Sequence, residues 1–99
     1  MSEFRIELTP SAELSLIKLK KNNSQKAVYK AVSKTIRLLS ENPRHPGLKT
    51  HKYSSLKGAN EEEVFEAYAQ NTTPGAFRVF WFYGPGKKVI TIIAITAHP

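Results

Sequence analysis

The alternation of apolar and polar residues near the start of the chain predicts a strand followed by a helix. Phe4–Leu8 alternates at a period of two, which is typical of a half-buried strand. Thr9 and Pro10 then mark a helix start, because a threonine oxygen can accept from a free backbone N–H and proline suits the first helical position. We therefore expect a helix over residues 10–21. The helix would bury some of its apolar residues Ala12, Leu16, Ile17 and Leu19.

A second helix is predicted over residues 25–41, after the connector Asn22–Ser24, in which Ser24 is a favourable N-cap. Its apolar side recurs at steps of three and four and consists of Val28, Val32, Thr35, Ile36 and Leu39. Basic residues recur at the same spacing, at Lys26, Lys30, Lys34 and Arg37. Like charges at this spacing repel one another and no acid interrupts them, so we interpret the basic stripe as a binding face, with a solvated face as the alternative.

The rest of the chain is predicted to form a long loop and then three strands. Two prolines and a glycine within Asn42–Gly47 end the second helix, and the loop continues to Gly58. Alternating and β-branched patterns then predict strands over residues 64–69, 76–83 and 88–97. The order β-α-α-β-β-β predicts an α+β fold, with a helical hairpin packed on one face of an antiparallel sheet and residues 1–99 in a single domain.

The composition changes this picture mainly through charge. The chain has 99 residues, with 15 Lys and Arg against 8 Asp and Glu, and a formal net charge of +7. Eleven of the basic residues lie between Lys18 and Lys57, where Glu41 is the one acid. This imbalance favours a polyanionic partner, either a nucleic acid or an acidic protein that mimics one, over a face that is basic only for solubility.

Several classes of function are excluded by what the sequence lacks. The absence of cysteine removes disulfides, thiolate zinc sites and cysteine nucleophiles. The longest apolar stretch, near Val89–Ala97, is half the roughly 20 residues that a membrane helix needs, and no secretory signal is visible. We therefore expect a cytoplasmic protein with no membrane partner. No histidine spacing suits a metal, and neither a P-loop, a GxGxxG nor a GxSxG motif is present, so no metal or other cofactor is expected.

The turn lengths predict which side chains share a face of the sheet. A hairpin loop over residues 71–75 places Tyr68 opposite Arg78. The same loop places Glu66 opposite Phe80. Glu66, Tyr68 and Arg78 then share one face, although a slip of one residue would move Arg78 to the other. The face covered by the helices would carry Phe65, Ala67, Phe77, Val79 and Trp81.

Arg78 stands alone in an apolar strand, where an unpaired buried guanidinium would be too costly. Two interpretations stay open: Arg78 forms a cross-strand salt bridge with Glu66, or it faces a groove and binds phosphate through its planar fork of donors. Three histidines are also candidates. His45 is expected to be a loop residue, His51 lies in a basic loop that could help hold RNA, and His98, taken alone, is a tail residue.

Four segments along the chain support a resemblance to a known family. They are the Asn42-Pro43 end of the helical hairpin, Leu56-Lys57-Gly58, the strand Gly75–Trp81, and an apolar last strand that runs into Ile95–His98. Together with the β-α-α-β-β-β order, they resemble the RelE/ParE toxin superfamily of bacterial type II toxin–antitoxin systems. The resemblance covers essentially the whole chain.

This resemblance implies a toxin that inhibits translation by cleaving mRNA on the ribosome through attack of a 2′-OH. By the same resemblance, Arg78 would contact the scissile phosphate and His98 would serve as general acid or phosphate ligand. An imidazole that titrates near neutral pH can give a proton to the leaving oxygen. The general base is unassigned among Glu66, His51 and a lysine, and we include Glu66 in the catalytic set. The residues expected to hold RNA are Lys49, His51, Lys52, Lys57 and Tyr68.

A departure from the family pattern leaves two alternatives. Some ribonuclease members use a glutamate just before the second strand, where this chain reads Tyr53-Ser54-Ser55. One alternative is a ParE-like toxin that poisons DNA gyrase without hydrolysis, and the other is a non-catalytic RNA-binding domain. A toxin also implies partners, namely a cognate antitoxin with an acidic or amphipathic segment, the ribosome and mRNA.

Overall fold

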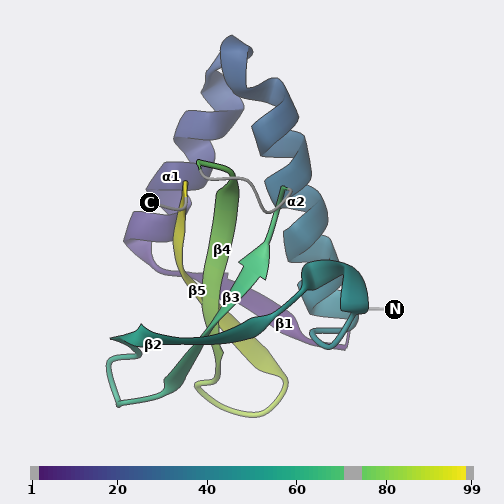
Figure 1. Ribbon diagram of the computed structural model, residues 1–99. Helices are drawn as coiled ribbons and strands as arrows, with labels where there is room; N and C mark the ends of the chain where they lie inside the picture. Colours follow the sequence, from purple (N-terminus) through teal and green to yellow (C-terminus); the bar gives the residue numbers. More distant parts are fainter. Residues whose placement is uncertain (1–2, 71–74, 98–99) are drawn as a thin grey trace.

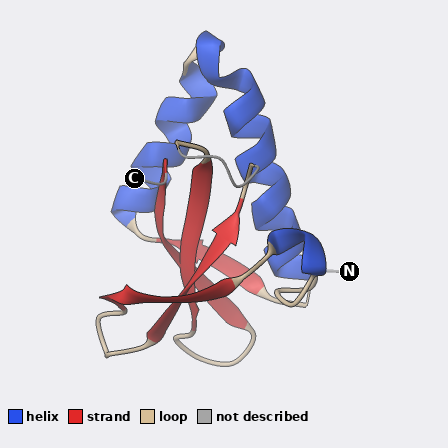
Figure 2. Ribbon diagram, in the orientation of Figure 1, coloured by secondary structure: helices blue, strands red, loops and turns tan. Residues whose placement is uncertain are grey.

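A computed structural model describes residues 3–70 and 75–97, in which two helices pack on one face of a five-stranded sheet (Figures 1 and 2). The helices are α1 (Pro10–Lys21) and α2 (Lys26–Glu41), with short 3-10 turns η1 (Asn23–Gln25) and η2 (Pro46–Leu48). The strands are β1 (Arg5–Leu8), β2 (His51–Lys57), β3 (Glu63–Tyr68), β4 (Phe77–Tyr83) and β5 (Val89–Ala97). This α+β architecture confirms the predicted fold class.

The sheet has the order β1-β5-β4-β3-β2 and is mixed, so the prediction of a purely antiparallel sheet was wrong for one strand. The pairs β2–β3, β3–β4 and β4–β5 are antiparallel, whereas β1 pairs with β5 in parallel. A hairpin makes the two strands that it joins antiparallel. β1 and β5 are joined through the long chain between them, which allows them to run in parallel. β5 thereby has a neighbour on each side, which fits its β-branched sequence.

The predicted loop over residues 48–58 was also wrong, because His51–Lys57 forms strand β2. β2 is an edge strand, and six of its seven residues are exposed. A strand with little buried surface needs no alternation of apolar and polar residues. Its place in the sheet comes from backbone pairing with β3, which the side-chain pattern does not encode.

Helix α1 begins and ends where the sequence predicts. The Thr9 hydroxyl accepts from the Ala12 N–H at 3.2 Å and lies 3.3 Å from the carbonyl oxygen of Ile93, to which it donates. The predicted N-cap at Ser24 was wrong. Asn22 caps the η1 turn by accepting from the Ser24 N–H at 3.0 Å, and α2 follows this turn without a side-chain cap.

The main core lies between the helices and the sheet. Its fully or nearly fully buried residues include Ala12, Leu19, Val32, Leu39, Leu48, Ala67, Val79, Trp81, Ile90, Ile92 and Ile95. A smaller cluster of Val64, Phe80 and Phe82 lies on the opposite face, with Tyr53, Ile93 and Ala94 packed against it. Within the described part of the chain, no helix is both long enough and apolar enough to cross a membrane.

Candidate functional site

The register that positions the candidate site is the one predicted from the hairpin length. Tyr68 pairs with Arg78 across β3 and β4, and Glu66 pairs with Phe80. Glu66, Tyr68 and Arg78 therefore share the face of the sheet that the helices leave uncovered, as predicted. The residues that alternate with them along the two strands, namely Phe65, Ala67, Phe77, Val79 and Trp81, lie on the helix side as predicted.

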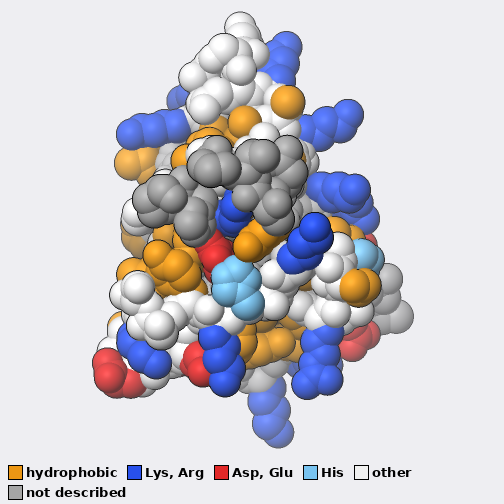
Figure 3. All heavy atoms as spheres, in the orientation of Figure 1, with side chains coloured by type: hydrophobic (Ala, Val, Ile, Leu, Met, Phe, Trp, Pro, Cys, Tyr) orange, Lys and Arg blue, Asp and Glu red, His pale blue; other side chains and the backbone are white. Residues whose placement is uncertain are grey.

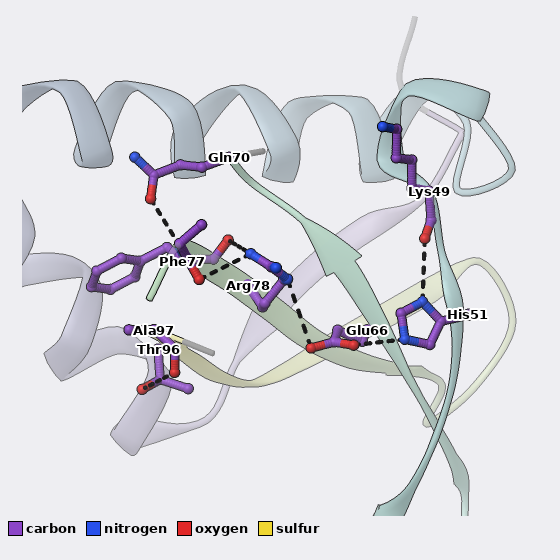
Figure 4. A network of polar contacts seen from close by, with 9 residues as sticks. Lys49, His51, Glu66, Gln70, Phe77, Arg78, Thr96 and Ala97 are labelled. Carbon is purple, nitrogen blue, oxygen red and sulfur yellow. Dashed lines mark hydrogen bonds and ion pairs between the residues drawn. The ribbon is translucent and has the colours of Figure 1, made fainter. Parts of the chain in front are cut away.

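Glu66 is the centre of a buried polar cluster (Figure 4). Its side chain is 2% exposed, and Oε1 lies 2.7 Å from Nε2 of His51. Oε2 lies 3.9 Å from Nε of Arg78, at the outer limit of an ion pair. A carboxylate this deeply buried is costly to the fold unless such partners lie close by.

Arg78 is fixed by several contacts at once. Nη1 donates to the carbonyl oxygens of Ala76 at 2.9 Å and Phe77 at 3.3 Å. The guanidinium carbon lies 4.1 Å from the centre of the Tyr68 ring, within the range of a cation–π contact. The side chain is 3% exposed and forms an ion pair with Glu66. Of the two interpretations left open above, this is the cross-strand salt bridge. Contact between Arg78 and a scissile phosphate stays a prediction.

His51 is the accessible member of the cluster. Its side chain is 48% exposed, and its ring meets the Tyr68 ring edge-on with 5.6 Å between centroids. Nδ1 lies 3.4 Å from the carbonyl oxygen of Lys49, a long contact. His51 was predicted as an RNA-binding residue and a possible base, but its contact with Glu66 was not predicted. That contact depends on the pairing of His51 with Glu66 across β2 and β3, and β2 was predicted as a loop.

The other predicted site residues lie in two places. Lys49, Lys52 and Lys57 are exposed in or just before β2, where Lys52 pairs with Glu63 at 3.3 Å. The basic stripe Lys26, Lys30, Lys34 and Arg37 is exposed along α2. In Figure 3, basic side chains surround a central area in which a histidine lies beside an acidic side chain. The predicted catalytic residue His98 lies outside the described residues.

The arrangement brings together the groups that acid–base chemistry on a phosphodiester needs. A carboxylate and an imidazole are in hydrogen-bond contact, and a guanidinium lies on the far side of the carboxylate. Across residues 3–70 and 75–97, no group of three or more His, Asp or Glu side chains is placed to hold a metal ion.

Comparison with solved structures identifies the fold. A YoeB/ParE toxin from Agrobacterium tumefaciens matches with a TM-score of 0.71 and 12% identity, over 97% of this chain and 100% of that one. A chain of the archaeal RelE–RelB complex from Pyrococcus horikoshii matches at 0.67 and 19%, over 96% and 94%. The YoeB dimer from Staphylococcus aureus matches at 0.65 and 16%, over 99% and 100%. No protein-family model and no curated protein sequence matches the chain. The chain therefore has the fold of RelE/ParE-type toxins.

Proposed function

We propose that this chain is the toxin of a toxin–antitoxin system and that it cleaves mRNA on the ribosome. The observation that supports the proposal is the His51–Glu66–Arg78 cluster on the uncovered face of a RelE/ParE-type fold. The fold alone does not distinguish a ribonuclease from a gyrase poison. A gyrase poison, however, has no need of an imidazole and a carboxylate in hydrogen-bond contact.

Cleavage by a neighbouring 2′-OH requires a base, a proton donor for the leaving 5′ oxygen and neutralisation of charge on the phosphorane. In the proposed site, Glu66 accepts a hydrogen bond from Nε2 of His51 and holds the ring in place. When Nε2 donates to Glu66, the lone pair of an unprotonated ring is on Nδ1, so this nitrogen takes the proton from RNA. This step requires the carbonyl oxygen of Lys49, which lies 3.4 Å from Nδ1, to move aside. His51 is thus the general base, and Glu66 is its positioning residue.

Arg78 and His98 complete the proposal. Arg78 contributes positive charge beside Glu66. Its side chain is 3% exposed, so the guanidinium must move out of its buried position to contact phosphate directly. His98 follows the end of β5, the strand paired with β4, and is proposed as the proton donor to the leaving oxygen. The exposed lysines Lys49, Lys52 and Lys57 would hold the phosphates of the RNA.

The partners follow from the same proposal. The Pyrococcus neighbour comes from a RelE–RelB complex, so we infer a protein antitoxin for this chain as well. An acidic segment of that antitoxin would match the net charge of +7. The other partners are the ribosome and mRNA, which places the activity in the cytoplasm.

The test is to map new 5′ ends of mRNA in cells that express the wild type, His51→Gln or Ser55→Ala. Ser55 is an exposed residue of the same strand and serves as the matched control. We expect ends phased with codons for the wild type and Ser55→Ala, and their loss, together with relief of growth arrest, for His51→Gln. His98→Ala should give the same loss.

Three outcomes would contradict the proposal. Cleavage that survives His51→Gln would remove His51 from the base role. Growth arrest with DNA damage and without new mRNA ends would indicate the gyrase alternative. Tight RNA binding with neither arrest nor new ends would indicate a non-catalytic RNA-binding domain. Circular dichroism of each purified variant separates loss of activity from loss of fold.

A further inference from the structure

A pocket lies on the face of the sheet opposite the His51–Glu66–Arg78 cluster. It has a volume of about 450 Å³ and lies between the loop that follows α2 and the side chains of Phe65, Trp81 and Tyr83. Side chains alternate between faces along a strand, so Phe65 points away from the face that holds Glu66. The proposed catalytic chemistry does not use this pocket.

Two polar atoms at this pocket have no hydrogen-bond partner within the described structure. They are the indole Nε1 of Trp81 and the hydroxyl of Thr50, and both residues line the pocket. Trp81 is 1% exposed, so water does not freely reach its N–H. A buried donor without an acceptor is costly, and an indole N–H can only donate. Because the N–H is shielded in this structure, a ligand that presents an acceptor satisfies Trp81 only if a neighbouring side chain of the pocket moves aside.

The walls and the rim of the pocket differ in character. Phe65 stacks on Trp81 with 5.0 Å between ring centroids, and Tyr83 meets Trp81 edge-on at 4.9 Å. Arg44 and Lys49 line the pocket from the loop and are exposed. Neither is in an ion pair with any residue that the structure describes. An aromatic wall beside two free cations suits a ligand with a flat apolar part and an anionic part.

The strands that form the wall favour a compact ligand over an added peptide strand. β3 lies between β2 and β4, and β4 lies between β3 and β5, so neither has an open edge. A peptide that extends the sheet would need such an edge. The volume is within the range of pockets that hold small molecules.

We propose that this pocket binds a nucleotide. The base packs against the aromatic wall, one of its acceptor atoms receives the hydrogen bond of Trp81 Nε1, and the phosphate is held by Arg44 and Lys49. The nucleotide is either free or part of an RNA chain, since both present the same chemistry. This site shares Lys49 with the RNA-binding lysines proposed above, but its readout involves no cleavage.

Trp81 is the only tryptophan of the chain, so its indole N–H resonance reports on this pocket alone. The ¹⁵N-labelled protein is titrated with adenosine and uridine 5′-monophosphates, a 2′-O-methyl oligoribonucleotide that cannot be cleaved, and inorganic phosphate. We expect a saturable shift of the Trp81 indole resonance with nucleotides. Lys49→Gln should weaken binding about tenfold, as for loss of a hydrogen bond to a charged group. Lys20→Gln, an exposed lysine on α1, is the matched control and should have no effect.

The arms of the titration separate the sources and the alternatives. A shift with the monophosphates supports a site for free nucleotide, and a shift with the oligonucleotide alone supports a site for a nucleotide of RNA. No shift with either overturns the proposal. Equal affinity for inorganic phosphate and the monophosphates also overturns it, because the base would then contribute nothing.

Discussion

Burial of the Glu66 carboxylate has a cost that its neighbours must offset. Its side chain is 2% exposed, with Arg78 at 3.9 Å and His51 at 2.7 Å. Arg78 is buried to a similar degree and also lies over the Tyr68 ring. If the two charges stabilise each other, removal of either one leaves the other buried beside a neutral group.

This reasoning predicts a coupled pair. Glu66→Leu and Arg78→Met should each lower the free energy of unfolding by about 3–5 kcal/mol, because each leaves one uncompensated charge. The double variant replaces both groups with apolar side chains of similar volume, so it should lose clearly less than the sum. Urea denaturation of the four proteins gives the coupling free energy. Additive losses would show that Glu66 and Arg78 do not stabilise each other.

At the residue scale, the sequence predicted what depends on local geometry. Glu66, Tyr68 and Arg78 were placed on one face by the length of one hairpin loop and the alternation of its strands. The contact of His51 with Glu66 was not predictable, because it joins an unpredicted edge strand to β3. The pocket beside Trp81 was missed for a related reason, since Thr50 and Tyr83 are far apart in sequence and no local pattern brings them together.

At the element scale, Thr9 links α1 to the sheet as well as capping it. Its hydroxyl oxygen accepts from the Ala12 N–H, and the hydroxyl lies 3.3 Å from the carbonyl oxygen of Ile93. Ile93 is the extra residue where the β4–β5 register shifts, because Phe80 pairs with Ala94 and Trp81 with Ile92. The Thr9 side chain therefore caps the start of α1 and also hydrogen-bonds to the bulged strand β5.

Thr9→Ala should lower the free energy of unfolding by about 1–2 kcal/mol, at the upper end for an N-cap, because it removes both contacts. Thr9→Ser keeps the hydroxyl and should recover most of the loss. Thermal and urea unfolding of the three proteins provide the measurement. A loss as large in Thr9→Ser as in Thr9→Ala would attribute the effect to the missing methyl group instead.

The elements that the sequence predicted best are those with a buried side. α1, α2, β3, β4 and β5 each bury one or both faces, so their apolar residues follow the period of the element. β2 lacks that signal because it is exposed along most of its length. The parallel pairing of β1 with β5 was missed because alternation identifies a strand but not the direction of its neighbour.

At the scale of the whole molecule, the net charge of +7 raises the question of where a polyanion binds. The stripe Lys26, Lys30, Lys34 and Arg37 is exposed along α2. Lys30, Lys34 and Arg37 line a groove together with Ala27, Ala31 and Ser33. α1 carries a comparable group of lysines in its last turn, at Lys18, Lys20 and Lys21. The α2 stripe has four basic residues and the α1 group has three, and the two groups lie on different helices.

Matched triple variants on the two helices allow the α2 face to be tested against net charge alone. The variants Lys26/Lys30/Lys34→Gln and Lys18/Lys20/Lys21→Gln each remove the same number of positive charges from the net +7. If RNA contacts the α2 face, the α2 variant should lower the slope of log K against log salt by about 2, as expected for three lost phosphate contacts to a single strand. The α1 variant should leave the slope nearly unchanged. Fluorescence anisotropy with a labelled 2′-O-methyl oligoribonucleotide at several salt concentrations measures both slopes. Equal decreases would mean that the molecule attracts RNA through its overall charge, and the α2 stripe would then be only a solvated face.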